Sequence, residues 1–172
     1  MTPAAGFWLS QIRADLDPAT FDCGVDSLDR WLAQMALRTN SQDIARVYVW
    51  TRPDSARVVA YFAVSPTLVA RQTVGRSLGG GQTEVPGFLL GRLALDRSLH
   101  GRGLGGQLLL DALETIVLAA RSSGGRVIVV DPVGNAAAEF YAHHGFIPTV
   151  AGPRMAMKVA TAAGALGGRL GA

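Results

Sequence analysis

The sequence predicts an α/β domain built on a mixed sheet, and three observations support this. Segments rich in β-branched and aromatic residues are interspersed with segments of helical periodicity. A glycine-rich turn joins one buried strand to an apolar helix, and another apolar strand follows, which makes a β-α-β unit. The length of 172 residues suits one domain. We therefore expect a single domain over residues 1–160 and a flexible tail over residues 161–172, where the sequence is low in complexity.

The first half of the chain predicts four elements. "FWLSQIR" (7–13) alternates as an edge strand does, and "VDSLDRWLAQMALRT" (25–39) predicts one amphipathic helix with Asp26 or Ser27 as its N-cap. The helical spacing is that of Leu28, Trp31, Leu32 and Met35. "ARVYVWT" and "RVVAYFAVS" flank a turn-type segment and predict a β-hairpin. Residues 71–87 have many glycines and no periodicity, which predicts an exposed, mobile loop.

The second half predicts two strand–helix pairs and a last strand. "FLLGRLALD" (88–96) reads as a buried strand, with a possible bulge at Gly91, and an apolar helix follows over 104–121. "RVIVVD" is a continuous apolar strand, and "NAAAEFYAHHG" is a short helix that ends at Gly145. "MAMKV" (155–159) is the last strand.

Composition excludes several classes of protein. Hydrophobic residues make up 49% of the chain and charged residues 17%, so we expect a globular protein and not a disordered one. No apolar run approaches a membrane span and no signal segment is evident, which predicts a soluble, cytoplasmic protein without a membrane partner. Cys23 is the only cysteine, and the three histidines lack metal-binding spacing, so we expect neither a disulfide nor a metal site.

The basic residues are almost all arginine, because Lys158 is the only lysine. Arginine pairs well with phosphate oxygens, so an anionic cofactor and a nucleic acid both remain open. Bias in the composition of the coding genome would give the same excess.

The glycine-rich segment "LHGRGLGGQLL" (99–109) lies between a strand and a helix. Backbone N–H groups at such a turn point outward at the positive end of the helix dipole and form an anion cradle. The segment lacks both the Walker pattern and the dinucleotide-binding pattern. Tight packing of a helix on a strand is the alternative reason for these glycines.

"LDRSLHGRGLGGQLLLDAL" resembles motif A of the Gcn5-related N-acetyltransferases (GNAT), Q/R-x-x-G-x-G/A, in which the turn cradles the pyrophosphate of acetyl-CoA. Gly103 and Gly105 match, and His100 stands where Gln or Arg is usual. "EFYAHHGF" resembles motif B. Together with "FDCGVDSLDRWLAQMALR", these segments resemble the acetyltransferase toxins of bacterial type II toxin–antitoxin systems. The resemblance implies a central, mostly antiparallel sheet, splayed at the acetyl-CoA site and flanked by helices.

The resemblance also implies site residues. Tyr141 would be the general acid that protonates the departing CoA thiolate; the alternative is a tyrosine that only packs. Leu93 and Leu95 would act through backbone groups, and the N–H of Leu95 would face the oxyanion. Asn135 stands one residue later than the family's asparagine, and N-capping is the alternative role for it. The implied cofactor-binding residues are Leu93, Ala94, Leu95, His100, Gly101, Arg102, Gly103, Leu104, Gly105, Gly106, Asn135 and Tyr141.

The substrate implied by the resemblance is aminoacyl-tRNA, which is acetylated on its α-amine so that translation stops. The arginines that we expect to face this substrate are Arg38, Arg46, Arg71, Arg76 and Arg92. His143 and His144 invite the role of general base, but we favour a structural role for both. The implied partners are a ribbon-helix-helix antitoxin, operator DNA through that complex, and a second copy of the chain. The alternatives are an acetyltransferase of small amines, antibiotics or protein amines, and a non-catalytic acyl-CoA-binding regulator.

Overall fold

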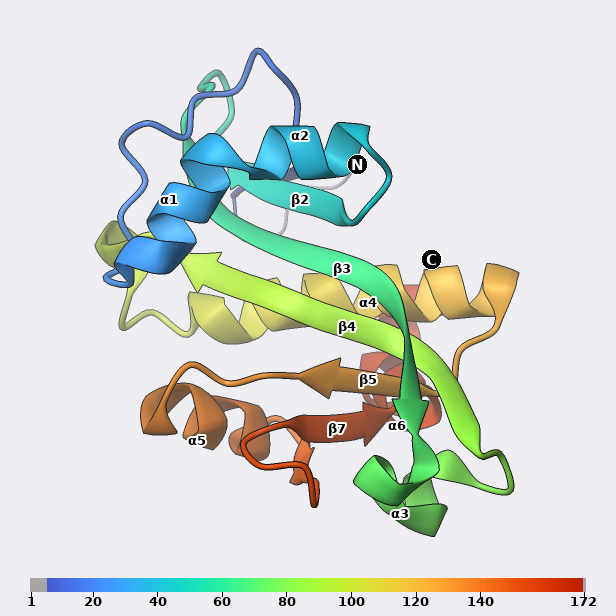
Figure 1. The fold of residues 1–172 in the computed structure, drawn as a ribbon. Coiled ribbons are helices and arrows are strands. Elements are labelled where there is room, and N and C mark those ends of the chain that lie inside the picture. Colours follow the sequence, from blue (N-terminus) through green and yellow to red (C-terminus); the bar gives the residue numbers. More distant parts are fainter. Residues whose placement is uncertain (1–5, 172) are drawn as a thin grey trace. The chain divides into compact units, whose positions relative to one another are not determined.

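The computed structural model describes residues 6–171, which divide into two compact units (Figure 1). The first unit consists of the chain up to Ser65 together with Arg92–Leu109, and the second of Pro66–Gly91 together with the chain from Leu110 onward. Two long strands, β3 (Val58–Ala70) and β4 (Glu84–Leu95), and the helix α4 (Leu104–Ser123) each run through both units. A single domain over residues 1–160 stays a prediction.

The remaining elements each belong to one unit. The first unit contains β1 (Trp8–Gln11), α1 (Asp26–Gln34), α2 (Ala36–Ser41), β2 (Arg46–Thr51) and the 3-10 turn η1 (Arg97–Leu99). The second contains α3 (Arg71–Gly79), β5 (Val127–Val130), α5 (Asn135–His143), β6 (Ile147–Pro148), β7 (Met155–Lys158), α6 (Val159–Leu166) and the 3-10 turn η2 (Gly167–Gly171). None of the helices in residues 6–171 is both long and apolar enough to cross a membrane.

The strands form a seven-stranded mixed sheet in the order β1-β2-β3-β4-β5-β7-β6. The pairs β1–β2, β2–β3, β5–β7 and β6–β7 are antiparallel, and β4–β5 is parallel. This confirms the predicted α/β class with a mostly antiparallel sheet. The parallel ladder of β4 with β5 covers Gly87–Leu90, and β4 continues to Leu95.

The core of the first unit lies between α1 and the strands β2 and β3. Leu32 is buried, and Trp31 stacks on Tyr61 of β3 with ring centroids 5.9 Å apart. The Tyr61 hydroxyl donates to the carbonyl of Leu28, which attaches the helix to the strand at 2.8 Å. The predicted amphipathic face of this helix is therefore the packed face.

The single helix predicted over 25–39 is instead two helices. α1 ends at Gln34, and a new helix begins at Ala36, so that the fully buried Ala36 faces the core while Met35 is 44% exposed. The predicted N-cap is also wrong, because Val25 occupies that position without a side-chain cap.

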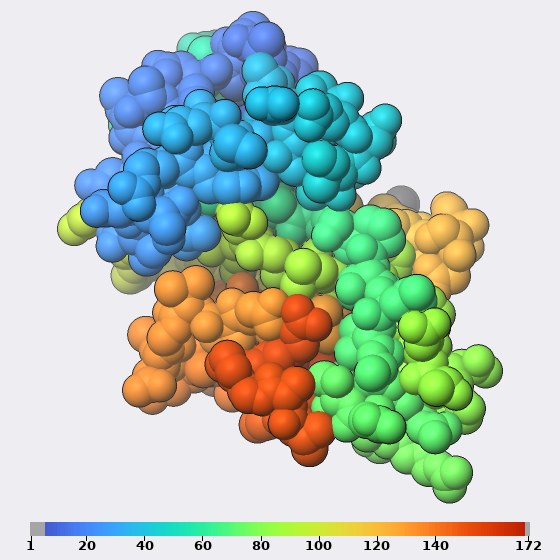
Figure 2. All heavy atoms as spheres, in the orientation of Figure 1, coloured from blue at the N-terminus to red at the C-terminus, as the bar shows by residue number. Residues whose placement is uncertain are grey.

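The loop predicted over 71–87 is largely structured. Val74 and Leu78 are buried on α3. Gly75, with φ +76°, lies between them and interrupts the helix, so the sequence shows no continuous helical periodicity. β4 then begins at Glu84. Figure 2 shows the red segment 149–154 beside the green α3, and the Val150 N–H donates to the Thr73 carbonyl there.

The end of the chain also differs from the predicted flexible tail. Residues 159–166 form α6, whose Ala162 and Leu166 are buried. Beyond it, Arg169 donates to the buried carboxylate of Asp111 on α4 at 2.6 Å. The exposed glycines Gly164, Gly167 and Gly168 make the sequence look low in complexity, while Ala162 and Leu166 provide the packing.

Candidate active site

The turn that follows β4 is organised by the buried carboxylate of Asp96, which is 3% exposed. One oxygen accepts from the Ser98 N–H at 3.0 Å and from the Ser98 hydroxyl at 2.7 Å. The other accepts from the Asp22 N–H at 3.1 Å and from Arg57 at 3.4 Å. Burial by itself raises the pKa of Asp96, but the bonds from Ser98 and Asp22 and the charge of Arg57 outweigh it and lower the pKa below its usual value. Asp96 is therefore an ionised anchor of the turn.

Two further bonds tie the same turn to the segment before α1. The Arg97 side chain donates to the Asp22 carboxylate at 2.9 Å, and the Arg97 N–H donates to the Asp22 carbonyl at 2.8 Å. The Asp22 carboxylate also accepts from the Gly24 N–H. The hydrogen bond from Arg97 lowers the pKa of Asp22. Residues 22–24 and 96–98 thus fold as one connected piece.

Sequence reasoning missed this anchor, although both aspartates lie in the quoted segments "FDCG" and "LDRS". The only available signal was that Asp is a common cap of short helices, which Asp96 is for η1. The residues missed are Asp22, Arg57, Asp96 and Arg97.

The glycine turn has the geometry of an anion cradle. Gly101 and Gly103 adopt φ +78° and +71°, which disfavour any side chain. A Cβ added at either position would meet nothing within 4 Å, so conformation and not space requires these glycines. Both are exposed, as is Arg102 between them, and α4 begins at Leu104. The first-turn N–H groups of a helix have no carbonyl partner within it, so this end suits a phosphate.

The end of β4 contains the residues predicted to bind through their backbone, Leu93–Leu95. Ala94 is buried, while Leu93 and Leu95 are half-buried. The Asp96 N–H donates to the Val59 carbonyl on β3 at 2.9 Å. The Leu95 carbonyl lies 2.7 Å from Nε2 of His100, so His100 closes the turn back onto the strand.

Tyr141 lies on α5 in the second unit, in an aromatic setting. Its ring meets those of Phe140 and Phe146 edge-on, each with centroids 5.4 Å apart. The side chain is 7% exposed, and burial raises the pKa of its phenol. Among the described residues, no charged group and no hydrogen bond contributes to this shift. The hydroxyl is thus protonated at neutral pH, and no residue in the range 6–171 accepts its proton.

The neighbours of Tyr141 in sequence are placed differently. His144 is a capping residue, because its Nδ1 lies 2.8 Å from the Phe140 carbonyl. His143 is exposed. Asn135 is the first residue of α5, and the N-cap is Gly134, with φ +85°. Capping by Asn135, the alternative to a cofactor contact, is therefore wrong.

An ion pair braces the loop before α5. Arg154 donates from Nε and a terminal nitrogen to both oxygens of Asp131, each bond 2.8 Å long. The bond from Arg154 lowers the pKa of Asp131. Asp131 directly follows β5, so this fork fixes the start of the connection to the helix of Tyr141. Sequence reasoning did not identify this pair.

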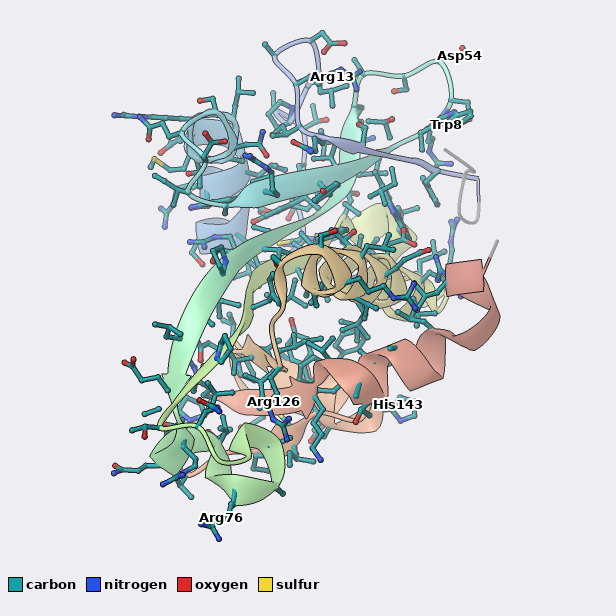
Figure 3. All side chains as sticks on the ribbon, turned by 90° about the vertical axis from the view of Figure 1, so that its right-hand side faces the viewer. Trp8, Arg13, Asp54, Arg76, Arg126 and His143 are labelled. Carbon is teal, nitrogen blue, oxygen red and sulfur yellow. The ribbon has the colours of Figure 1, made fainter. Side chains whose placement is uncertain are left out.

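Two of the five arginines expected at the substrate surface are exposed, and the other three are engaged by neighbouring residues. Arg38, Arg46 and Arg92 belong to the first unit and Arg71 and Arg76 to the second. Arg38 and Arg76 are exposed, and Figure 3 shows Arg76 projecting away from α3.

The other three arginines are engaged by neighbours. Arg46 pairs with Asp43 at 2.7 Å, and Arg71 donates to the Gly81 carbonyl at 3.3 Å. The Arg92 guanidinium lies over the Trp31 ring, 4.2 Å from its centroid. Its buried Nε has no hydrogen-bond partner among the described residues.

Comparison with known proteins places these features in context. A family model described as the acetyltransferase (GNAT) domain matches residues 54–148. The "tRNA-acetylating toxin" of Mycobacterium tuberculosis (strain ATCC 25618 / H37Rv) is 38% identical over 144 residues, which cover 83% of this chain and 86% of that protein.

Several solved structures are similar over nearly the whole chain. AtaT complexed with acetyl-methionyl-tRNAfMet has a TM-score of 0.83 at 26% identity and covers 90% of this chain and 96% of AtaT. A mutant AtaT bound to the C-terminus of the antitoxin AtaR and acetyl-CoA has a TM-score of 0.82 at 25% identity, with coverages of 94% and 99%. A KacTA–DNA complex has a TM-score of 0.80 at 25% identity, with coverages of 93% and 98%.

Proposed function

The chain belongs to the GNAT acetyltransferase family, and from this we propose that it transfers acetyl from acetyl-CoA to the α-amine of the amino acid on a charged tRNA. The observation that supports this substrate most strongly is the 38% identity to a tRNA-acetylating toxin over 83% of the chain. An acetylated α-amine cannot form a peptide bond, so the protein acts as a toxin that blocks translation.

The first unit supplies most of the acetyl-CoA-binding residues of the proposal. The turn from Gly101 to Gly106 has the positive-φ glycines and the helix start that fit a pyrophosphate, and Arg102 adds a charge beside it. Leu93 and Leu95 offer backbone groups, with Ala94 between them, and His100 and Leu104 flank the turn. Asn135 remains a proposed contact. When bound, acetyl-CoA supplies the acetyl group as a thioester.

Tyr141 is the proposed general acid. Its phenol is neutral because burial raises its pKa, and its proton is available because no described residue accepts it. Tyr141 donates this proton to the thiolate that leaves as the amine forms its amide bond. The phenolate regains a proton from the acetylated nitrogen, directly or through water. We propose no histidine as a base, since His144 is bonded to a carbonyl and His143 is exposed.

The proposed tRNA surface is basic. Of the predicted residues Arg38, Arg46, Arg71, Arg76 and Arg92, the exposed Arg38 and Arg76 are the ones free to meet backbone phosphates. Contacts of this kind make binding fall steeply with salt. Arg92 is less free to contact a phosphate, because its guanidinium is already stacked on Trp31.

The partners proposed for the chain follow from its relatives. AtaT binds the C-terminus of the antitoxin AtaR, and KacTA binds DNA. We infer for this chain a ribbon-helix-helix antitoxin, operator DNA through the complex, and a homodimer. A substrate of charged tRNA also places its action in the cytoplasm.

The test is transfer of labelled acetyl from acetyl-CoA to total charged tRNA, beside panels of proteins and small amines. Tyr141→Phe keeps the ring packing and loses the proton, so we expect transfer to fall by about 10²- to 10⁴-fold with no change in thermal stability. Tyr48→Phe is the matched control, since Tyr48 of β2 stacks on Phe62 of β3 and this variant should remain active.

Three outcomes contradict the proposal in different ways. Label found only in amines or proteins identifies an acetyltransferase of those substrates. Binding of acetyl-CoA without any transfer identifies an acyl-CoA-binding regulator. Full activity of Tyr141→Phe removes the general-acid role while leaving the substrate in place.

A further inference from the structure

The peptide group between Leu95 and Asp96 is held at both of its poles. Its N–H, from Asp96, donates to the Val59 carbonyl on β3 at 2.9 Å. Its C=O, from Leu95, lies 2.7 Å from Nε2 of His100. A carbonyl oxygen can only accept, so the Nε2 of His100 must carry a hydrogen, in the neutral ring or in the imidazolium.

The two bonds define which edge of β4 the Leu95 backbone faces. In a trans peptide the N–H and C=O point in opposite directions, so the Leu95 carbonyl faces away from β3. Within an extended strand, the N–H and C=O of one residue face the same edge. The Leu95 N–H therefore shares the edge away from β3 with the carbonyl that His100 holds.

A strand residue with no neighbouring strand on one edge offers its backbone N–H as a donor and its C=O as an acceptor to a ligand at that edge. At Leu95 the acceptor is already occupied, and only the donor remains. A thioester oxygen needs a donor and cannot use an acceptor. A free carbonyl at the same edge would oppose the negative charge that develops on that oxygen.

We propose that His100 is a positioning residue for acetyl transfer, whose Nε2–H occupies the Leu95 carbonyl and leaves this edge of β4 as a donor site for the thioester oxygen. The inference rests on the proposed function, because it assigns the Leu95 N–H to that oxygen. His100 itself touches neither reacting group. It acts by fixing the Leu95 peptide and by removing a competing acceptor.

Two variants separate the donor from the ring. His100→Gln retains an N–H donor on a flexible side chain, whereas His100→Leu has a similar width and no donor. His143→Leu is the matched control, since His143 is an exposed histidine of the second unit. The first readout is calorimetric affinity for acetyl-CoA compared with affinity for CoA, which lacks the thioester oxygen. The second is kcat for transfer to charged tRNA.

We expect wild type, His100→Gln and His143→Leu to bind acetyl-CoA more tightly than CoA. In His100→Leu this preference should fall several-fold, and kcat should fall about 10-fold, the scale of one lost hydrogen bond. The inference is overturned if His100→Leu retains the preference, if His100→Gln is as impaired as His100→Leu, or if both variants lose thermal stability equally. If wild type transfers acetyl to no charged tRNA, the proposed function fails, and the two affinities still decide the role of His100.

Discussion

Replacing Asp96 by asparagine tests whether its carboxylate anchors the turn after β4. The two oxygens together accept four hydrogen bonds. An amide in the same place turns one acceptor into a donor, which then faces either the Asp22 N–H or the Ser98 N–H. One backbone donor loses its partner in either orientation. When the amide nitrogen faces Asp22, Arg57 also loses its acceptor and, with its side chain 47% exposed, turns to water.

A buried donor without a partner costs about 1–3 kcal/mol, so we expect Asp96→Asn to lower the free energy of unfolding by about 2 kcal/mol. For a chain of this length that corresponds to a fall in Tm of roughly 4–8 °C. The assays are urea unfolding at pH 7 and thermal unfolding. The control is Asp15→Asn, because Asp15 and Arg13 form an exposed pair, with side chains 69% and 53% exposed, and pairs of this kind contribute little to stability.

The effect of Asp96 should also depend on pH in one direction. Its pKa is lowered in the folded chain, so its stabilisation is complete above the unfolded value of about 3.9 and is lost as pH falls through the folded pKa. The difference between wild type and Asp96→Asn should thus be constant from pH 5 to 8 and shrink below about pH 4. Equal stability of Asp96→Asn and Asp15→Asn, or a difference that grows in acid, would refute the anchor.

Three further outcomes follow from packing and charge. Arg169→Ala should lower the free energy of unfolding by about 2 kcal/mol, measured with urea, because it removes a cation from the buried Asp111. Arg169→Lys should restore part of this loss. Gly125→Ala should unfold at a clearly lower Tm, since its Cβ would lie 2.4 Å from the Phe88 ring at φ +129°. The Cys23 thiol, whose pKa burial raises to about 12, should react with a thiol reagent at pH 8 only after denaturant is added.

Most strands and helices were predictable because their periodicity is local. The β2–β3 hairpin, the strand–turn–helix around Gly101–Gly106 and the helix that bears Tyr141 all stand where the sequence puts them. The failures share a cause. Gly75 in α3 and the glycines of the C-terminal segment suggested loops, but Val74, Leu78 and Leu166 are buried there. Burial by a distant part of the chain outweighs local propensity.

The same distinction applies to the site: residues in contiguous motifs were predictable, and residues joined by long-range bonds were not. The glycine turn and Tyr141 are readable because family motifs are contiguous. The bonds of Asp96 to Asp22 and Arg57 span 74 and 39 residues and leave no periodic trace. The arginines show what sequence reasoning cannot predict, since nothing in the sequence distinguishes the surroundings of Arg46, Arg71 and Arg92. Only the structure shows that each is engaged by a different neighbour.

The bonds between Asp22, Asp96 and Arg97 join two segments that are far apart in the sequence and that both carry the family resemblance. Asp22 lies four residues before α1, and Asp96 lies eight before α4. Because Asp22 binds both Asp96 and Arg97, hydrogen bonds connect the turn after β4 to the segment before α1. α1 in turn carries Trp31, on which Arg92 is stacked. Order at the proposed acetyl-CoA turn and order at a proposed substrate-binding arginine are therefore linked within one unit.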